Sequence, residues 1–238
     1  LTLSQNLCAN CLPHIHKYIT TTTSSEAAVE QSLDILNTIL KKFPQAIRQD
    51  KTCSSIVEKD DLVARIQELL ETGNTAIKRA ASACLGSLAH FLDKDKLTPI
   101  ADRIFKGISS KDLKATIIRV QTLALLGRNG GSKLDALIPN QTEFFLNEIK
   151  EHLQEGKVDV LGEEHLSQYL SNLLQIIETS MKNSDRVLIK FLRDKNRLKD
   201  LEEILQNSLH FNPNMPEFLA FDDEEEGRLM GYFRGCRF

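Results

Sequence analysis

Four residues near the start of the chain are of the types that bind zinc. Cys8, Cys11, His14 and His16 stand within one nine-residue stretch, "CANCLPHIH". Thiolate and imidazole groups in a tetrahedral set hold structural zinc ions, but their ligand pairs are usually separated by a longer loop that folds back around the metal. Here the ligands are crowded together and Pro13 interrupts them. A zinc site is therefore the less favoured interpretation of this stretch.

The same segment carries the spacing of a helix. Leu7, Cys11, Ile15 and Ile19 recur every four residues, which would place them on one stripe. A free cysteine behaves as a small apolar residue when it is buried. The spacing favours a helix over residues 7–19, with Cys11 as a core residue.

Two further segments contain residue types found in catalytic or nucleotide sites. The segment "GRNGGSK" at 127–133 lacks the G-x-x-x-x-G-K-[ST] spacing and the preceding strand of a phosphate-binding loop. Its glycines follow an amphipathic stretch, so they predict a helix end near Gly127. The segment "GEEHL" at 162–166 lacks the H-E-x-x-H spacing of a zinc enzyme. We expect no catalytic residue, no metal and no cofactor.

Composition restricts the class of partner. The chain has 238 residues, of which 41% are hydrophobic, enough for a core without disulfides or metal. Its five cysteines follow no disulfide framework, which favours a reducing compartment. The net charge is −3, aromatic residues make up 6%, and no apolar run approaches the roughly 20 residues of a membrane span. We expect a protein partner, no nucleic acid or membrane, and an intracellular location.

Helical periodicity runs through nearly all of the chain, and strand-like alternation is almost absent. Apolar residues at Val29, Leu33, Leu36 and Leu40 have the spacing of one buried helix face. The pattern predicts an all-α fold with short, antiparallel connections. The clearest predicted helices cover residues 27–40, 62–70, 75–92, 97–108 and 111–127.

Helix pairs recur along the chain with a roughly constant period. The pairs 62–92 and 97–127 are offset by one unit of about 35 to 45 residues, which indicates an α-solenoid. The segment "NTAIKRAASACLGSL" resembles the second helix of a HEAT repeat, and its Ala81 and Gly86 would let a neighbouring helix approach closely. We predict a HEAT-type α-solenoid of stacked antiparallel helix pairs over residues 1–209.

The polar sides of the second helices are the predicted binding surface. In a solenoid these sides line up into one continuous inner surface. The residues expected to contact a partner are Arg79, Ser82, His90, Lys114, Gln121 and Arg128. The alternative for each is a solvated side chain without a binding role.

The amino-acid composition of the chain changes after residue 209. The segment "HFNPNMPEFLAFDDEEEG" combines prolines, aromatic residues and a run of five acids. Such a composition favours a mobile acidic segment over a packed helix. We therefore predict an acidic loop and carboxy-terminal tail over residues 210–238.

A family resemblance rests on these features together. The HEAT-like helices, followed by "ILQNSLHFNPNMPEF" and then "DDEEE", resemble the amino-terminal part of the cullin-associated, neddylation-dissociated proteins. The segment 115–139, "ATIIRVQTLALLGRNGGSKLDALIP", is also similar to an early repeat of that family and the start of the next. The resemblance covers most of the chain, but only the turn and the acidic run are distinctive.

The resemblance implies a regulator of ubiquitin ligases that is not an enzyme. Proteins of this family bind unneddylated cullin–RING ligases, and their amino-terminal repeats cover the RING end and block neddylation. Their carboxy-terminal repeats compete with substrate adaptors, but only "RLMGYFRGCRF" follows the acidic run here. We expect a cullin and its RING subunit as partners. The chain would then be either a fragment of such a protein or its amino-terminal half, with a separate polypeptide as the carboxy-terminal half. The alternative is a transport- or chromatin-type HEAT adaptor for another protein.

Overall fold

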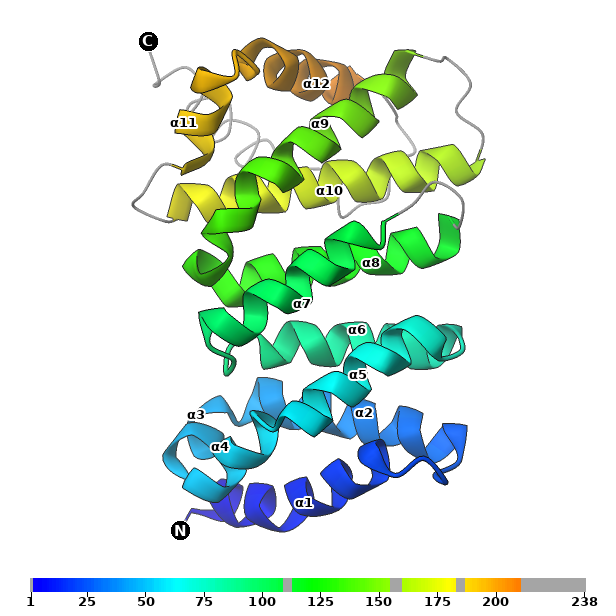
Figure 1. Ribbon diagram of the computed structural model, residues 1–238, viewed down its shortest axis with the longest axis vertical. Helices are drawn as coiled ribbons and strands as arrows, with labels where there is room; N and C mark the ends of the chain where they lie inside the picture. Colours follow the sequence, from blue (N-terminus) through cyan, green and yellow to red (C-terminus); the bar gives the residue numbers. More distant parts are fainter. Residues whose placement is uncertain (1, 109–112, 155–159, 183–186, 211–238) are drawn as a thin grey trace. The chain divides into compact units, whose positions relative to one another are not determined.

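The protein is all-helical in the part that the structure describes. The computed structural model describes residues 2–108, 113–154, 160–182 and 187–210, and these residues contain helices and no strand (Figure 1). The predicted all-α class is confirmed. Contacts divide the chain into a first unit, Leu1–Lys195, and a second unit, Asn196–Phe238.

The helices of the first unit follow one another with short connections. They are α1 (Leu3–Thr20), α2 (Glu26–Lys42), α3 (Pro44–Gln49), α4 (Lys51–Val57), α5 (Asp60–Thr72), α6 (Thr75–Leu88), α7 (Lys94–Lys106), α8 (Leu113–Gly130), the 3-10 helix η1 (Gly131–Leu137), α9 (Ile138–Gln154), α10 (Val160–Lys182) and α11 (Val187–Asp194). The described part of the second unit contains α12 (Leu198–His210).

Side-chain caps and proline set several helix starts. Thr2 forms a capping box with Gln5 before α1, and the Asn74 side chain accepts a hydrogen bond of 2.9 Å from the Ile77 amide at the start of α6. These bonds satisfy N–H groups that have no partner within the helix. Pro44 occupies the first turn of α3, where its missing N–H costs nothing. These features explain where α1, α3 and α6 begin.

Two predicted helix ends differ from the structure. The helix predicted to stop at Gly127 continues to Gly130, and Gly131 then adopts a φ of 55°, which glycine reaches without strain. The helix predicted over 75–92 ends at Leu88 and is followed by a turn. Gly127 does not end α8, because a glycine inside a helix only lowers its stability. A helix typically ends where a residue adopts the left-handed conformation, and here that residue is Gly131.

The helix predicted over residues 7–19 is present as α1, but its buried stripe is different. Cys8, Leu12, Ile15 and Ile19 are buried, whereas Leu7 is 45% exposed. A constant spacing of four residues drifts by about 40° per step around a helix of 3.6 residues per turn. The predicted stripe is therefore wrong at Leu7 and Cys11, and Cys11 is only half-buried.

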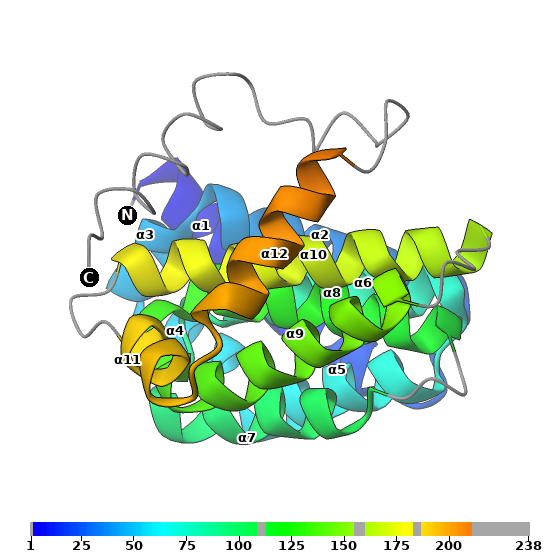
Figure 2. The ribbon, with the colours of Figure 1, turned by 90° about the horizontal axis from the view of Figure 1, so that it is seen from above.

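Helix pairs pack in chain order within the first unit. The pairs α1 with α2, α5 with α6, α7 with α8 and α9 with α10 are in contact, and α2, α6, α8 and α10 pack each against the next. Figure 2 shows α6, α8 and α10 in one layer and α5, α7 and α9 in the other. The predicted core face of α2, which consists of Val29, Leu33, Leu36 and Leu40, is buried.

A close approach joins α6 to α8. A Cβ atom added at Gly86 would lie 2.6 Å from the Leu125 Cβ, and Ala81 is fully buried. The Asn129 Nδ2 donates a hydrogen bond of 2.7 Å to the Gly86 carbonyl, so backbone of α6 is held directly by α8. The expectation that the small residue at position 86 leaves room for a neighbouring helix is confirmed.

A polar contact joins α1 to α5. The His16 Nε2 lies 3.1 Å from both carboxylate oxygens of Asp61. This hydrogen bond is the main cause that lowers the pKa of Asp61. Because Asp61 is 59% exposed, solvent screens the pair strongly.

The pKa shift of Asp61 predicts how stability depends on pH. A carboxyl group with a lowered folded-state pKa stabilises the fold above its unfolded pKa, and the contribution is lost as pH falls through the folded value. Asp61→Asn should cost less than about 1 kcal/mol of unfolding free energy at neutral pH. The difference in unfolding free energy between Asp61→Asn and the wild-type protein should become smaller below about pH 4. Urea denaturation across pH tests this; a constant difference down to the acid transition would contradict it.

The second unit is described only through α12. Leu201 and Ile204 of α12 are buried, and the Arg197 Nε lies 2.6 Å from Asp200 Oδ2 in an ion pair. The predicted boundary between residues 209 and 210 falls near the end of this helix. Residues 211–238 lie outside the described residues, so the acidic loop and tail stay a prediction.

Candidate partner-binding groove

An open groove runs across three helices that pack side by side and has a volume of about 470 Å³. It is lined by α6, α8 and α10. The lining residues are Arg79, Ser82 and Ala83 of α6, Val120, Gln121, Ala124, Leu125 and Arg128 of α8, and Gln168, Ser171, Asn172 and Gln175 of α10. Four of the six residues predicted to contact a partner, Arg79, Ser82, Gln121 and Arg128, therefore line one groove.

Sequence spacing explains why these side chains share a surface. On α8 the lining residues at 121, 124, 125 and 128 follow the pattern i, i+3, i+4 and i+7, and those on α10 at 168, 171, 172 and 175 repeat it. Such positions lie on one face of a helix. Because α6, α8 and α10 pack side by side, their three faces join into one surface.

Two arginines supply the charge of the groove. Arg79 and Arg128 are exposed, and neither has an ion-pair partner among the described residues. No aspartate or glutamate is among the residues that line the groove. The groove therefore offers positive charge that no lining carboxylate neutralises.

Carboxamides supply most of the remaining polar groups. Gln121, Gln168, Asn172 and Gln175 all line the groove. Asn172 is only 1% exposed, and its Nδ2 has no hydrogen-bond partner among the described residues. This atom has almost no accessible surface, so the half-buried Gln121 and Gln168 present the amide groups that an incoming segment can reach.

Ser82 has a structural role within the groove wall. Its side chain is 5% exposed, and its hydroxyl is hydrogen-bonded to the hydroxyl of Thr122 across 2.8 Å. This bond links α6 to α8. Ser82 therefore presents little surface to a partner, and its predicted binding role stays untested.

The other two predicted residues lie apart from the described groove lining. His90 follows the end of α6, is exposed, and its carbonyl accepts a hydrogen bond of 3.1 Å from Arg48 Nη2. Burial, followed by the charges of Arg48 and Lys133, lowers the pKa of the His90 imidazole. The side chain of Lys114 lies outside the described residues.

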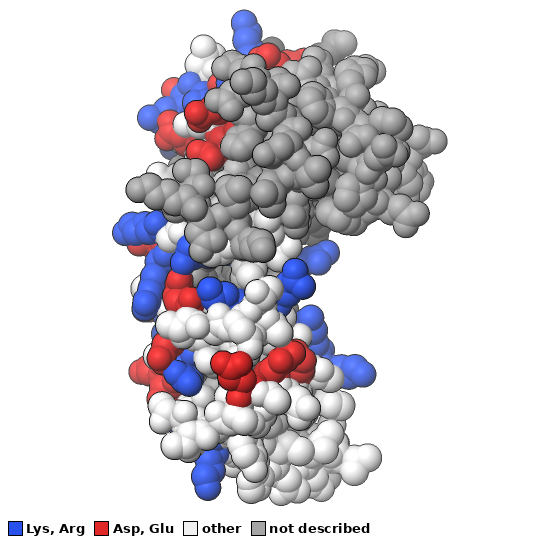
Figure 3. Space-filling model, turned by 90° about the vertical axis from the view of Figure 1, so that its right-hand side faces the viewer, with Lys and Arg blue, Asp and Glu red and all other residues white. Residues whose placement is uncertain are grey.

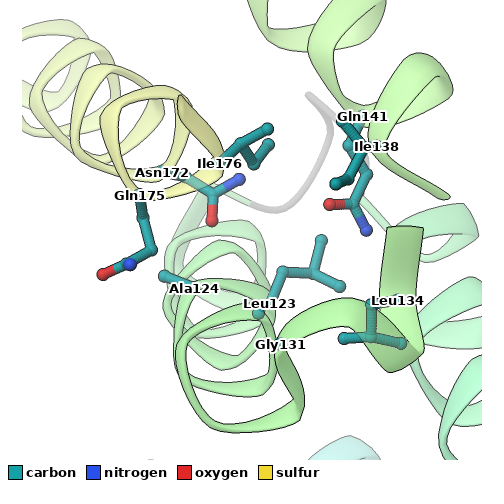
Figure 4. A pocket seen from close by; sticks show the side chains of 10 residues that line it. Leu123, Ala124, Gly131, Leu134, Ile138, Gln141, Asn172, Gln175 and Ile176 are labelled. Atoms are coloured by element: carbon teal, nitrogen blue, oxygen red, sulfur yellow. The ribbon is translucent and has the colours of Figure 1, made fainter. Parts of the chain in front are cut away.

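A small cavity lies next to the groove and shares part of its wall. It has a volume of about 20 Å³ and is lined mainly by apolar side chains of α8, η1, α9 and α10, including Leu123, Leu134 and Ile138. Figure 4 shows the Asn172 and Gln141 amides in this largely apolar lining. The space is about that of a single water molecule, so it offers no site for a larger ligand.

Sequence reasoning missed the contribution of α10 to the groove. Gln168, Ser171, Asn172 and Gln175 were not among the predicted contact residues. A signal was present, because these polar residues recur at helical spacing between apolar residues of the same segment, of which Leu166, Leu170 and Leu173 are buried. To predict these residues as part of the groove, one would have to know that α10 packs beside α8.

The zinc candidates at the amino terminus do not converge. Cys8 is fully buried and His14 is exposed, so the two side chains lie on different faces of α1, and His16 contacts Asp61. No group of three or more cysteine, histidine or acidic side chains among the described residues could hold a metal ion. The four residues therefore act separately in the described part of the fold.

Burial predicts which cysteines react with thiol reagents. Burial raises the pKa of Cys8 and of Cys84, and raises that of Cys53 to about 11. Since the thiolate is the reactive form, Cys11 should be modified at least about tenfold faster than these three in the native protein. Mass spectrometry after maleimide labelling tests the order. Equal rates at Cys8 and Cys11, or protection of Cys11 that a chelator removes, would contradict it.

Charge elsewhere on the surface is mixed. Basic and acidic side chains are interspersed over the described part of the face in Figure 3. Among the described helices, none has both the length and the apolar character needed to cross a bilayer. The groove is therefore the feature whose chemistry is best defined.

Comparisons with known proteins add no relative. The chain matches no protein family, no curated protein and no solved structure. The candidate site is consequently defined by the geometry of α6, α8 and α10 and by the residues that line them.

Proposed function

We propose that the chain is a non-catalytic HEAT-type scaffold that binds a protein partner along the groove over α6, α8 and α10. The observation that carries this proposal is the repeated packing of α2, α6, α8 and α10, each against the next. Stacked helix pairs of this kind form an α-solenoid, in which equivalent helix faces make an extended binding surface. The matched lining positions of α8 and α10 support this interpretation.

The proposed partner is an unneddylated cullin–RING ubiquitin ligase. This choice rests on the resemblance of the helices, the asparagine–proline turn and the acidic run to the cullin-associated, neddylation-dissociated proteins. By covering the RING end of the cullin, the scaffold would block neddylation sterically. Such a regulator would act in the cytoplasm and nucleus. The adaptor-displacing half would belong either to the same protein, of which this chain is then a fragment, or to a separate polypeptide.

Capture of a purified cullin–RING complex tests the proposal. The immobilised chain should retain the unneddylated complex and lose most of it after neddylation. It should also slow neddylation when added in excess over the complex. Retention of neither form would contradict the cullin proposal and would favour a HEAT adaptor for another protein.

The same capture experiment tests the need for a second polypeptide. If the amino-terminal repeats provide the RING-end contacts, the chain alone should retain the unneddylated complex. It should not displace a bound substrate adaptor, because that activity belongs to the other half of the family's proteins. Displacement of the adaptor by this chain alone would contradict the division of roles.

A further inference from the structure

We infer that the groove over α6, α8 and α10 recognises an extended acidic segment of a protein partner. This inference deepens the proposed scaffold function and rests on it. It assigns separate roles to two sets of side chains, the arginines Arg79 and Arg128 and the carboxamides of α8 and α10. Two observations support the inference. The groove is lined by arginines and carboxamides, and neither arginine has an ion-pair partner among the described residues.

The arginines determine the charge of the segment. Arg79 on α6 and Arg128 on α8 are exposed at the groove, and the lining includes no carboxylate. A guanidinium group binds a carboxylate through two parallel N–H···O hydrogen bonds. An incoming aspartate or glutamate would give each arginine the partner that the described residues do not supply. A basic segment would meet two like charges.

The carboxamides favour an extended main chain. Gln121 and Gln168 each carry an N–H₂ donor and a carbonyl acceptor, which complement the C=O and N–H groups of a peptide. An extended segment leaves those main-chain groups free, whereas a helix pairs them internally. Both glutamines are half-buried, so part of each side chain is exposed at the groove.

The apolar part of the groove fits a peptide better than a nucleic acid. Ala83, Val120, Ala124 and Leu125 line it beside the polar groups. Aliphatic surface packs against the methylene groups of glutamate and similar side chains. Binding of single-stranded nucleic acid typically uses aromatic side chains that stack on bases, and no aromatic residue is in the lining.

Fluorescence anisotropy with a defined peptide tests the charge preference. The probe is a fluorescein-labelled peptide of Glu-Ser-Gly repeats, and the control probe replaces each glutamate with glutamine. The full chain should bind the acidic probe at least about tenfold more tightly at low salt, and added salt should reduce the difference. Equal affinity for the two probes would overturn the inference.

Charge reversal locates the binding site. The double variant Arg79→Glu with Arg128→Glu should lose at least about tenfold in affinity for the acidic probe. The control is Arg103→Glu, because Arg103 is also exposed but belongs to α7 and lines a different groove, with α5. It should change affinity by less than about twofold. An equal loss in the control, or no loss in the double variant, would overturn the inference.

Gln121 tests the role assigned to the carboxamides. Gln121→Leu keeps a similar volume at a half-buried position of the groove, so the thermal midpoint should change little. Affinity for the acidic probe should nevertheless fall by about threefold or more, which corresponds to one lost hydrogen bond. Unchanged affinity in a folded Gln121→Leu protein would overturn the main-chain role.

The cullin capture assay separates this inference from the proposed function. If the double arginine variant still captures the unneddylated complex and both probes bind equally, the acidic-segment inference fails while the scaffold proposal stands. If wild-type protein captures no cullin but binds the acidic probe through Arg79 and Arg128, the cullin proposal fails while the groove's preference is supported.

Discussion

Replacing Phe145 with alanine is expected to lower the free energy of unfolding by about 3–5 kcal/mol, the range for truncating a buried phenylalanine. Phe145 of α9 is fully buried. Its ring centroid lies 5.1 Å from that of Phe144 and 5.6 Å from that of Tyr169 on α10. The substitution removes the apolar contacts that hold α9 to α10 and leaves a cavity between them. A loss of this size is a large part of a typical domain's stability.

Urea denaturation followed by circular dichroism measures the effect at Phe145. Phe145→Leu serves as the control, because it keeps most of the apolar volume and should cost much less than the alanine variant. A change below about 1 kcal/mol for Phe145→Ala would contradict the observed burial of the ring. If unfolding occurs in two steps, the loss should fall in the step that reports α9 and α10.

The Gly86→Ala substitution is expected to destabilise the protein by about 1–3 kcal/mol, although alanine has a higher helix propensity than glycine. The added Cβ would lie 2.6 Å from the Leu125 Cβ, a position that no rotation of the leucine side chain can change. The backbones of α6 and α8 would have to separate. This movement would also strain the hydrogen bond from Asn129 Nδ2 to the Gly86 carbonyl.

Gly127→Ala is a matched control for Gly86→Ala. Gly127 also lies in a helix, but a Cβ atom added there would have no neighbouring heavy atom within 4 Å. The control should stabilise the protein by up to about 1 kcal/mol through helix propensity alone. Thermal and urea unfolding of the two variants test the prediction together. A stabilising Gly86→Ala variant would show that α6 and α8 do not approach closely at this position.

Local pattern was sufficient to predict much of the fold. The apolar spacing at Val29, Leu33, Leu36 and Leu40 identified the buried face of α2, and Gly86 identified a close helix contact. The buried face of α1 was predicted wrongly, because two sets of apolar residues in 7–19 have helical spacing. One set begins with Leu7 and Cys11, the other begins with Cys8 and Leu12, and both include Ile15 and Ile19. Only packing against α2, α3, α4 and α5 decides that Cys8 and Leu12 are buried instead of Leu7 and Cys11.

The candidate site was less predictable than the helices. Polar residues on α6 and α8 could be chosen because each helix has a polar side, but the sequence does not show which helices are neighbours. Ser82 illustrates the difficulty, since its position suggested exposure and the approach of Thr122 buries it. The contribution of Asn172 depends on the packing of α10 beside α8, which is a long-range contact.

Hydrogen–deuterium exchange with and without an unneddylated cullin–RING complex tests most directly whether this groove binds the partner. The account predicts slower exchange in peptides that cover residues 79–83, 120–128 and 168–175 when the complex is added. Peptides that cover α5 and α7 should change less. Protection confined to α5 and α7, or no protection in the three groove segments at saturating complex, would contradict the assignment of the groove as the binding surface.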